Sequence, residues 1–378
     1  MSTQLWTDHL GRSYPYEPYS AEPIAHQEMK LSGEAALAIA EASRALGTLP
    51  ALPLAGIAAV LYRSESSASS IIEGLTAGPR RVLEAEFAGT GEVDDEIGTR
   101  IVGNLDALRD AVSTAKPPKS DDFLRWHRIL TEGSPRMQPH HVGAYRLEQN
   151  WIGGDASGPR RASFIPPAPG EIPSLMGDLE QFCARSDIAP LQQALIAHGR
   201  FEVIHPFVDG NGRVGRMLLQ HLLVQRLRLA SPVPVSIPWS RDKDRYIAGL
   251  RAYQDGDLDT WIEFASGSVI EAVNWMGVAV GATSATLEHL RSRARTRGAS
   301  VAARIIDDLP AFPLVDAASV IERYQVSSQT AHGALGRLED QGVLVRRAFA
   351  RRAKTRGRPR QVYTAPDLIE TLSQLLTY

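Results

Sequence analysis

The sequence has a single cysteine, Cys183, among 378 residues. No disulfide can form within the chain, so we expect its fold to rest on an apolar core and its location to be the reducing cytoplasm. A long apolar run is also absent: the most apolar stretch, residues 51–62, contains Pro53 and falls far short of the roughly 20 residues that span a bilayer. The N-terminus has neither the basic start nor the apolar segment of a secretory leader, so we expect neither export nor membrane insertion.

Lysine is scarce, and charge is unevenly distributed. Only 5 of the 41 basic residues are lysine, so the presence of arginine as such says little here and its position matters more. The net charge is −2, but residues 301–378 carry 11 Lys and Arg against 8 Asp and Glu, whereas residues 1–300 carry 30 against 35. Because a basic segment attracts acidic partners, we expect such a partner to bind at the C-terminal end.

The periodicity of apolar residues is mostly helical. From Val214 onward, apolar residues recur at the spacing of one helix face, and Pro190 stands where a helix tolerates the missing N–H of proline. Two helices are therefore predicted to flank residues 205–213. Residues 143–169 contain aromatic and β-branched residues with a Gly-Gly pair, which favours a β-hairpin.

Residues 205–216, HPFVDGNGRVGR, have the residue types needed to bind phosphate groups. Gly210 and Gly212 lack Cβ atoms, so the chain can turn its N–H groups toward one point at the start of a helix, whose dipole favours negative charge. Arg213 and Arg216 are three residues apart, so both can offer guanidinium groups to neighbouring phosphate oxygens. The segment therefore predicts a site for a nucleotide triphosphate.

The same segment also contains groups for proton transfer and metal binding. His205 has the side chain whose ordinary pKa of about 6.5 suits proton abstraction near neutral pH. Asp209 offers the hard carboxylate oxygen that Mg²⁺ prefers when it shares its shell with water and nucleotide. Phe207 is expected in the core, and Asn211 can hold either the loop or a phosphate oxygen. Singly, each residue also has a structural explanation, because a histidine before proline is commonly a cap and GNG is commonly a turn.

Together, residues 205–216 resemble the HxFx[D/E]GNGRxxR signature of the Fic family. The resemblance implies a mainly α fold, with a helical core and a β-hairpin flap. It implies that His205 is the general base, that Asp209 binds Mg²⁺, and that phosphates bind at Gly210, Asn211, Gly212, Arg213 and Arg216. The implied reaction transfers AMP from ATP to a Ser, Thr or Tyr hydroxyl of a protein, the chain itself included, and releases pyrophosphate. It also implies a homodimer.

Two further segments match features of this family. Phe164, Ile165 and Pro166 resemble the flap, which holds the target by strand addition, a mode that tolerates many sequences. Tyr246 and Gln254 fall near the positions that face adenosine in relatives, where a Tyr-Tyr pair and an Asn are common. Because isoleucine follows Tyr246 and glutamine replaces asparagine, these positions specify the base less strictly than the loop specifies phosphate.

Residues 69–74, SSIIEG, match the inhibitory pattern [S/T]xxxE[G/N] of this family through Ser69, Glu73 and Gly74. In relatives this glutamate pairs with the second arginine of the signature, here Arg216, and keeps the γ-phosphate from binding productively. An arginine–carboxylate pair is geometrically demanding, so one glutamate can occupy the fork that the phosphate needs. The enzyme is therefore expected to be autoinhibited.

The C-terminal segment has the pattern of a winged helix-turn-helix domain. Ser327 can cap a helix that Gly342 ends, and two short strands follow. Between residues 346 and 360 there are eight Lys and Arg and no acid, which is typical of a wing that contacts nucleic-acid phosphates, although it can also be a solvated hairpin tip. The candidate DNA contacts are Ser328, Gln329, Arg351, Arg352, Arg356 and Arg358.

These patterns predict four regions. They are an N-terminal helical region (1–110), a catalytic core (111–285), a linker helix (286–300) and a winged-helix domain (301–378). The rival hypothesis is a DNA-binding regulator whose Fic-like part senses nucleotide. Its weakness is that a mere scaffold has no need of a base, a metal ligand and both arginines together. Within the enzyme class, another nucleotide donor or removal of AMP stays open.

Overall fold

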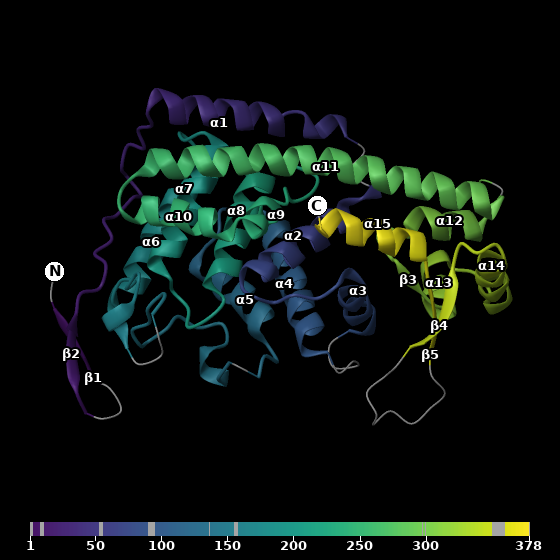
Figure 1. Ribbon diagram of the computed structural model, residues 1–378, viewed down its shortest axis with the longest axis horizontal. Helices are drawn as coiled ribbons and strands as arrows, with labels where there is room; N and C mark the ends of the chain where they lie inside the picture. Colours follow the sequence, from purple (N-terminus) through teal and green to yellow (C-terminus); the bar gives the residue numbers. More distant parts are fainter. Residues whose placement is uncertain are drawn as a thin grey trace. The chain divides into compact units, whose positions relative to one another are not determined.

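The computed structural model describes residues 3–7, 11–52, 56–89, 95–135, 137–154, 158–296, 298, 300–349 and 360–377. The chain is mainly α-helical, as predicted (Figure 1). Its helices are α1 (Gly33–Leu46), α2 (Ala58–Ile72), α3 (Pro79–Ala88), α4 (Glu96–Ser113), α5 (Ser120–Thr131), α6 (Ile172–Cys183), α7 (Pro190–Ile204), α8 (Asn211–Leu227), α9 (Ser236–Arg241), α10 (Lys243–Gln254), α11 (Leu258–Ala294), α12 (Val301–Asp308), α13 (Ala317–Tyr324), α14 (Ser328–Asp340) and α15 (Pro366–Thr377). Its strands are β1 (Gln4–Thr7), β2 (Ser13–Tyr16), β3 (Leu314–Val315), β4 (Val345–Phe349) and β5 (Arg360–Thr364). Short 3₁₀ turns lie at Leu49–Ala51, Pro139–His141, Pro159–Arg161 and Pro169–Glu171. None of the described helices has the length and apolarity needed to cross a membrane.

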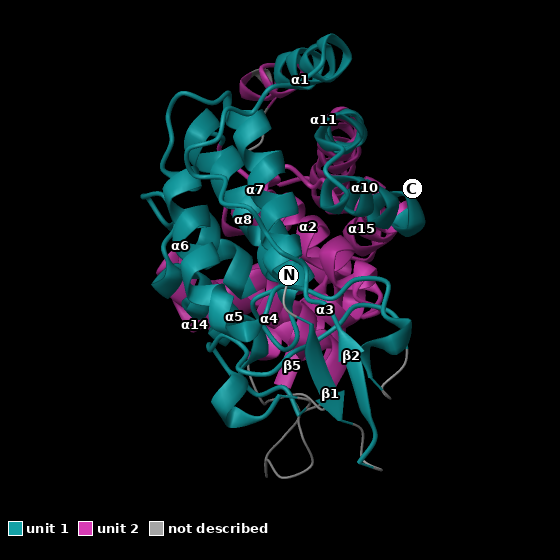
Figure 2. Cartoon of the chain, turned by 90° about the vertical axis from the view of Figure 1, so that its left-hand side faces the viewer, with its two compact units in different colours: residues 1–44, 106–229, 242–268 teal, residues 45–105, 230–241, 269–378 magenta. Residues whose placement is uncertain are grey.

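The chain forms two compact units, and each combines segments that lie far apart in the sequence (Figure 2). Unit 1 contains residues 1–44, 106–229 and 242–268. Unit 2 contains residues 45–105, 230–241 and 269–378.

The centre of unit 1 is a pair of buried helices, α7 and α8. α7 packs against α6, α8 and α10, and all its residues from Gln193 to Ile204 are buried. A helix that is buried on every side belongs to the core rather than to the surface. Pro190 occupies the start of α7, as predicted, and the loop of residues 205–210 joins α7 to α8. This loop is therefore held at both ends by the most buried helices of the unit.

Unit 2 contains the C-terminal elements in the order α12, β3, α13, α14, β4, β5. The three strands form one antiparallel sheet with the order β3-β5-β4. Ser327 caps α14 by accepting a hydrogen bond from the Thr330 N–H, and Gly342 follows the helix with a φ of +67°. The order of elements and the two helix ends are consistent with the predicted winged helix-turn-helix.

Candidate active site

His205 ends α7 in a strained backbone conformation. Its φ of 49° and ψ of 59° lie in the left-handed region, and its N–H donates to the Phe201 carbonyl at 2.9 Å. This conformation costs a non-glycine residue about 1 kcal/mol, and residues held in it cluster at functional sites. The following Pro206 cannot continue the helix. The chain therefore turns sharply at the residue that the sequence predicts to be the base.

Arg146 connects this turn to the segment of the predicted flap through hydrogen bonds to main-chain carbonyls. Its Nε donates to the His205 carbonyl at 2.9 Å and its Nη2 to the Pro167 carbonyl at 2.6 Å, while its own N–H donates to the Pro206 carbonyl at 2.9 Å. A third guanidinium bond runs to the Glu148 carbonyl. The side chain is only 1% exposed, and burial lowers its pKa to about 10, so it remains a cation at neutral pH.

We expect Arg146→Lys to lower the free energy of unfolding by about 2–4 kcal/mol, because one ammonium cannot satisfy three carbonyls that diverge around a planar guanidinium. Chemical denaturation of both proteins measures the difference. Arg80→Lys is the matched control, since the Arg80–Glu84 pair lies at the surface and such pairs contribute little. Equal losses in the two variants would contradict the role given to Arg146.

Asn211 and Asn150 hold the middle of the loop. The Asn211 Oδ1 accepts from the Phe207 N–H and its Nδ2 donates to the Phe207 carbonyl, both at 2.8 Å. Asn150 donates to the same carbonyl at 3.1 Å. The amide of Asn211 is thus engaged by the loop, and the ring of Phe207 is fully buried, as expected from the sequence. A contact of Asn211 with phosphate stays a prediction.

His127 is a loop-holding residue that the sequence did not reveal. Its ring stacks on Phe207 with centroids 3.9 Å apart, its Nδ1 accepts from the Gly143 N–H at 3.0 Å, and its Nε2 lies 3.0 Å from the Asp209 carbonyl. An acceptor Nδ1 requires the neutral Nε2–H tautomer, which donates to Asp209. Burial lowers the His127 pKa to about 4. A lone histidine on the apolar face of α5 gives no sequence signal of this role.

This lowered pKa predicts a loss of stability in mild acid. As the pH falls, His127 of the unfolded chain, with a pKa near 6.5, binds a proton before His127 of the folded chain does. This difference contributes about 3 kcal/mol to the free energy of unfolding. The contribution is complete above pH 6.5 and is lost as the pH falls to 4. His127→Gln, which keeps hydrogen-bonding groups without that ionisation, should flatten this part of the curve. Urea denaturation of both proteins between pH 4 and 7 measures the difference, and parallel curves would contradict it.

The start of α8 gathers the residues predicted to bind phosphate. Gly210 precedes the helix with a φ of 88°, a conformation that favours glycine. Arg213 and Arg216 are 3% and 2% exposed, and Arg213 Nη2 lies 3.3 Å from Asp209 Oδ1. Buried guanidinium groups at a helix N-terminus form a positively charged end that suits an anion. The assignment of individual phosphates to these residues stays a prediction.

Asp209 is the candidate metal ligand. Its carboxylate accepts from the Gly210 N–H at 2.6 Å, yet the side chain is 45% exposed and can reach an ion. Within the described residues, no group of three or more His, Cys, Asp or Glu side chains could hold a metal ion. One carboxylate is enough for Mg²⁺ when nucleotide phosphates and water complete its coordination shell. Asp209 therefore suits a Mg²⁺ ion that is bound together with a nucleotide.

The predicted flap is less regular than a hairpin. Ile152 and Phe164 form one antiparallel bridge, with the Ile152 N–H donating to the Phe164 carbonyl at 2.9 Å, and no longer ladder is found in the described residues. The reason is chemical: Pro166 and Pro167 have no N–H to donate. Ile165, between the bridge and these prolines, directs its carbonyl to Tyr19.

The predicted adenosine residues lie on α10. Tyr246 is 2% exposed, and its hydroxyl lies 2.9 Å from Nε2 of His198, whose pKa burial lowers to about 3. The Gln254 carbonyl accepts from the Tyr19 hydroxyl at 3.0 Å. Tyr246 is therefore a core residue beside the predicted site, and contact of either residue with adenosine stays a prediction.

Glu73 belongs to unit 2, where it follows α2 as an exposed residue. Gly74 ends this helix with a φ of +76°, which explains the glycine of the pattern. Within unit 2, α2 is fixed by the buried side chain of Arg63, which donates to Glu86 and to the carbonyls of Pro310 and Ala311. The pairing of Glu73 with Arg216 stays a prediction.

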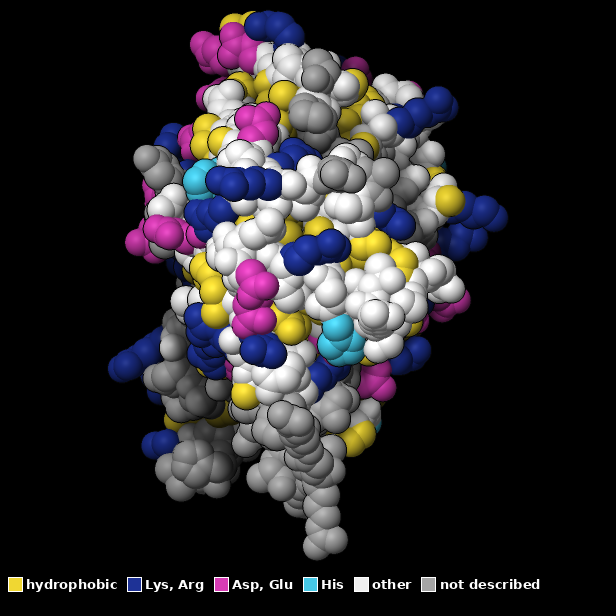
Figure 3. Space-filling model, turned by 90° about the vertical axis from the view of Figure 1, so that its right-hand side faces the viewer, with side chains coloured by type: hydrophobic (Ala, Val, Ile, Leu, Met, Phe, Trp, Pro, Cys, Tyr) yellow, Lys and Arg dark blue, Asp and Glu magenta, His cyan; other side chains and the backbone are white. Residues whose placement is uncertain are grey.

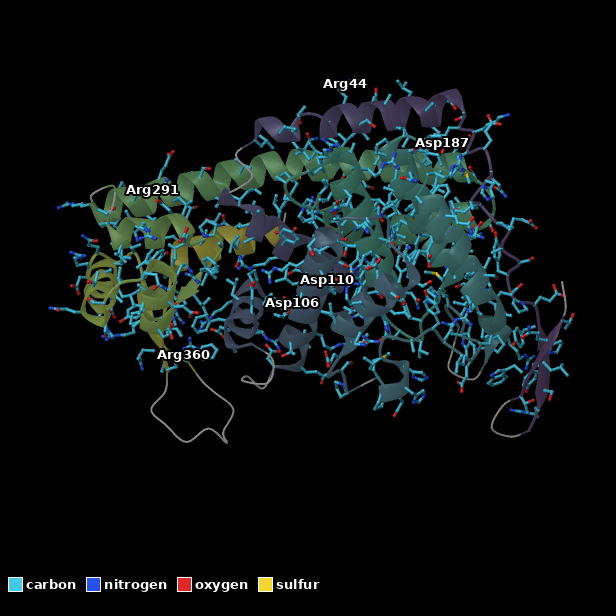
Figure 4. The ribbon with its side chains drawn as sticks, turned by 180° about the vertical axis from the view of Figure 1, so that it is seen from behind. Arg44, Asp106, Asp110, Asp187, Arg291 and Arg360 are labelled. Carbon is cyan, nitrogen blue, oxygen red and sulfur yellow. The ribbon has the colours of Figure 1, made fainter. Side chains whose placement is uncertain are left out.

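The predicted DNA contacts fall into two groups. Ser328 and Gln329 are exposed in the first turn of α14. Arg351, Arg352, Arg356 and Arg358 lie outside the described residues. Arg360, where β5 begins, ion-pairs with Asp316 and is labelled in Figure 4. Figure 3 shows Lys and Arg side chains over the face of the chain that includes this region.

The chain is similar in sequence and in fold to proteins of the Fic family. The sequence profile of the Fic/DOC family matches residues 117–223. The chain is 32% identical over 203 residues to proteins named Protein adenylyltransferase Fic from Drosophila melanogaster and Drosophila sechellia; the alignment covers 51% of this chain and 37% of each relative. It thus spans little more than a third of the length of these relatives. The chain is also similar to the crystal structure of a Fic family protein from Desulfovibrio desulfuricans G20, with a TM-score of 0.57 over 93% of this chain and 98% of that protein's chain. Because the two sequences are only 20% identical, this similarity supports the fold alone.

Proposed function

Since residues 117–223 are a domain of the Fic/DOC family, we propose that this chain is a protein adenylyltransferase that transfers AMP from ATP to a hydroxyl side chain of a protein. The observation that carries the proposal is the loop between α7 and α8. A base, a half-exposed carboxylate and two buried arginines lie within twelve residues, and Arg146, Asn150 and His127 fix its backbone. The curated relatives named adenylyltransferases support the same reaction.

In the proposed reaction, His205 takes the proton of the target hydroxyl as its oxygen attacks the α-phosphorus of ATP. The bond from this phosphorus to the oxygen bridging to the β-phosphate breaks, and pyrophosphate leaves with that electron pair. Arg213, Arg216 and the N-terminus of α8 offset the negative charge of the departing group. Asp209 would hold Mg²⁺, which supplies further positive charge at the phosphates when it is bound.

We further propose that Glu73 restrains this reaction by competing with the γ-phosphate for Arg216. The support is the pattern of Ser69, Glu73 and Gly74 at the C-terminal end of α2, a helix that the Arg63–Glu86 ion pair holds within unit 2. A carboxylate and a phosphate oxygen seek the same guanidinium donors, so only one can occupy them at a time.

The proposed function is tested with intact-mass measurements of wild type, Glu73→Gly and His205→Ala after incubation of each protein with each nucleoside triphosphate and Mg²⁺. An AMP adduct from ATP, absent in His205→Ala, supports the transferase. An adduct from another donor alone would replace ATP in the proposal. Loss of AMP from a modified protein, by hydrolysis of its bond to the hydroxyl oxygen, would favour removal of AMP as the activity. No adduct from any donor, in Glu73→Gly as well as in wild type, would favour the nucleotide-sensing regulator.

We also propose that the C-terminal elements bind DNA, with α14 reading bases and the basic segment contacting phosphates. Replacement of Arg351, Arg352, Arg356 and Arg358 by glutamine should weaken binding to any DNA duplex. It should also reduce the magnitude of the slope of log K against log salt concentration by roughly 3–4, because each phosphate contact accounts for the release of about 0.9 counterions. Fluorescence anisotropy with a labelled duplex measures both. Arg44→Gln, an exposed arginine of α1, is the control (Figure 4). Binding that does not change with salt would contradict phosphate contacts.

A further inference from the structure

The outer edge of the flap is already paired in this structure. Phe164 directs its main-chain groups to Ile152, so those of the next residue, Ile165, point to the opposite edge. There the Ile165 carbonyl accepts from the Tyr19 N–H at 2.8 Å. The occupant of the edge is thus an N-terminal segment of the same chain, residues 17–20, which lies outside the helices and strands.

Tyr19 reinforces this pairing with its side chain. Its ring lies against that of Phe164, with centroids 5.3 Å apart, and its hydroxyl crosses to the Gln254 carbonyl. One main-chain bond, one aromatic contact and one hydroxyl bond thus converge on a single residue. Elsewhere in residues 17–20, Glu17 and Ser20 are exposed.

The chain on either side of residues 17–20 is held independently of the flap edge. Downstream, the Ile24 and Ala25 N–H groups donate to Asp178, and Arg200 donates to the Glu22 carbonyl. Three more side chains bind the main chain at Gln27, Met29 and Ser32. Upstream, the β1–β2 hairpin, visible in Figure 2, contacts residues 151–160 through the Trp6–Trp151 ring pair and through Arg160 over Tyr14. None of these contacts of the flanking segments involves Tyr19.

We propose that the flap edge at Ile165 recognises an extended peptide with an aromatic side chain, and that residues 17–20 occupy this edge until such a peptide replaces Tyr19. The proposal rests on the proposed function, because it specifies the kind of target segment that the transferase accepts. A tethered occupant acts at an effective concentration of about a millimolar, so a peptide binding from solution must overcome that competition. Main-chain pairing leaves most of the target sequence free, whereas the place beside Phe164 selects an aromatic ring.

The test uses the full chain without nucleotide, so that its result does not depend on catalysis. The probe is a labelled synthetic peptide with the sequence of residues 13–23, and fluorescence anisotropy measures its affinity for wild type, Tyr19→Ala, Tyr19→Phe and the control Ser20→Ala. We expect Tyr19→Ala to bind the peptide at least tenfold more tightly than wild type, and Tyr19→Phe, which loses only the hydroxyl bond, to fall between them. Ser20→Ala should match wild type.

A second peptide with alanine in place of its Tyr19 equivalent should bind the Tyr19→Ala chain at least tenfold more weakly than the first. Equal affinities of the first peptide for wild type and both Tyr19 variants, or equal affinities of the two peptides, would overturn the proposal. Hydrogen exchange of the wild-type Tyr19 amide gives a check that needs no variant: slow exchange is expected, and exchange at the rate of an unpaired amide would also overturn it. Peptide binding with no AMP transfer even in Glu73→Gly would leave this inference about the flap edge intact and refute the proposed function alone.

Discussion

His205→Ala is expected to reduce AMP transfer by about a thousandfold, while leaving ATP binding within a few fold of wild type. Removal of a positioned general base typically costs two to four orders of magnitude in rate. Nucleotide affinity should survive, because the groups predicted to bind phosphate lie at the start of α8, and the predicted Mg²⁺ ligand is Asp209 rather than the imidazole. Transfer is measured by intact mass over time, and ATP affinity by calorimetry.

The experiment is best made in the Glu73→Gly background, where transfer is expected to be fast enough to quantify. His140→Ala is the matched control, because His140 is an exposed histidine outside the loop. Undiminished transfer after loss of His205 would remove the base from the mechanism. An equal loss in the His140 variant would indicate a general effect of histidine removal instead.

Glu73→Gly should raise transfer from ATP at least tenfold, which corresponds to only about 1.4 kcal/mol in the barrier. The physical reason is release of Arg216 for the γ-phosphate. Glu73→Gln separates charge from size: an amide retains the shape but not the charge, so it should activate in the same direction, though less strongly. Initial rates of adduct formation measure both variants.

If neither Glu73 variant transfers AMP faster, the inhibitory role proposed for Glu73 is wrong. The roles proposed for residues 205–216 would not be affected. An increase in the Gln variant equal to that in the Gly variant would place the whole effect in the carboxylate charge. Thermal unfolding of both variants serves as a control for damage to α2, whose last turn Gly74 already ends in a left-handed conformation.

Local sequence rules predicted the parts of the fold that depend on neighbouring residues. Pro190 marks the start of α7, Ser327 caps α14 and Gly342 follows it, because each of these ends is decided within a few residues. The candidate site at residues 205–216 could also be predicted, since its residues are contiguous and each type has a chemical reason at its position. The sequence predicts that Asn211 holds either the loop or a phosphate oxygen, and its amide holds the loop through Phe207.

The contacts that fix the site could not be predicted in this way, because they join residues far apart in the sequence. Arg146 reaches the His205 carbonyl across 59 positions and His127 reaches Asp209 across 82. Neither has a local pattern that distinguishes it from an ordinary arginine or core histidine. In the predicted flap, aromatic and β-branched residues favour a hairpin, but the described residues form one bridge there. The prolines after Ile165 have no N–H to extend it, and Tyr19 pairs with Ile165 at the other edge.

The central claim is that His205 is the general base for transfer of AMP from ATP bound at the start of α8, and that Glu73 controls this reaction. Its most direct test is the intact mass of Glu73→Gly and of Glu73→Gly combined with His205→Ala, after incubation with ATP, GTP, CTP or UTP and Mg²⁺. The account predicts an AMP adduct in the single variant, from ATP alone, and none in the double variant. An adduct that persists without His205, or one that forms only from a donor other than ATP, would contradict it.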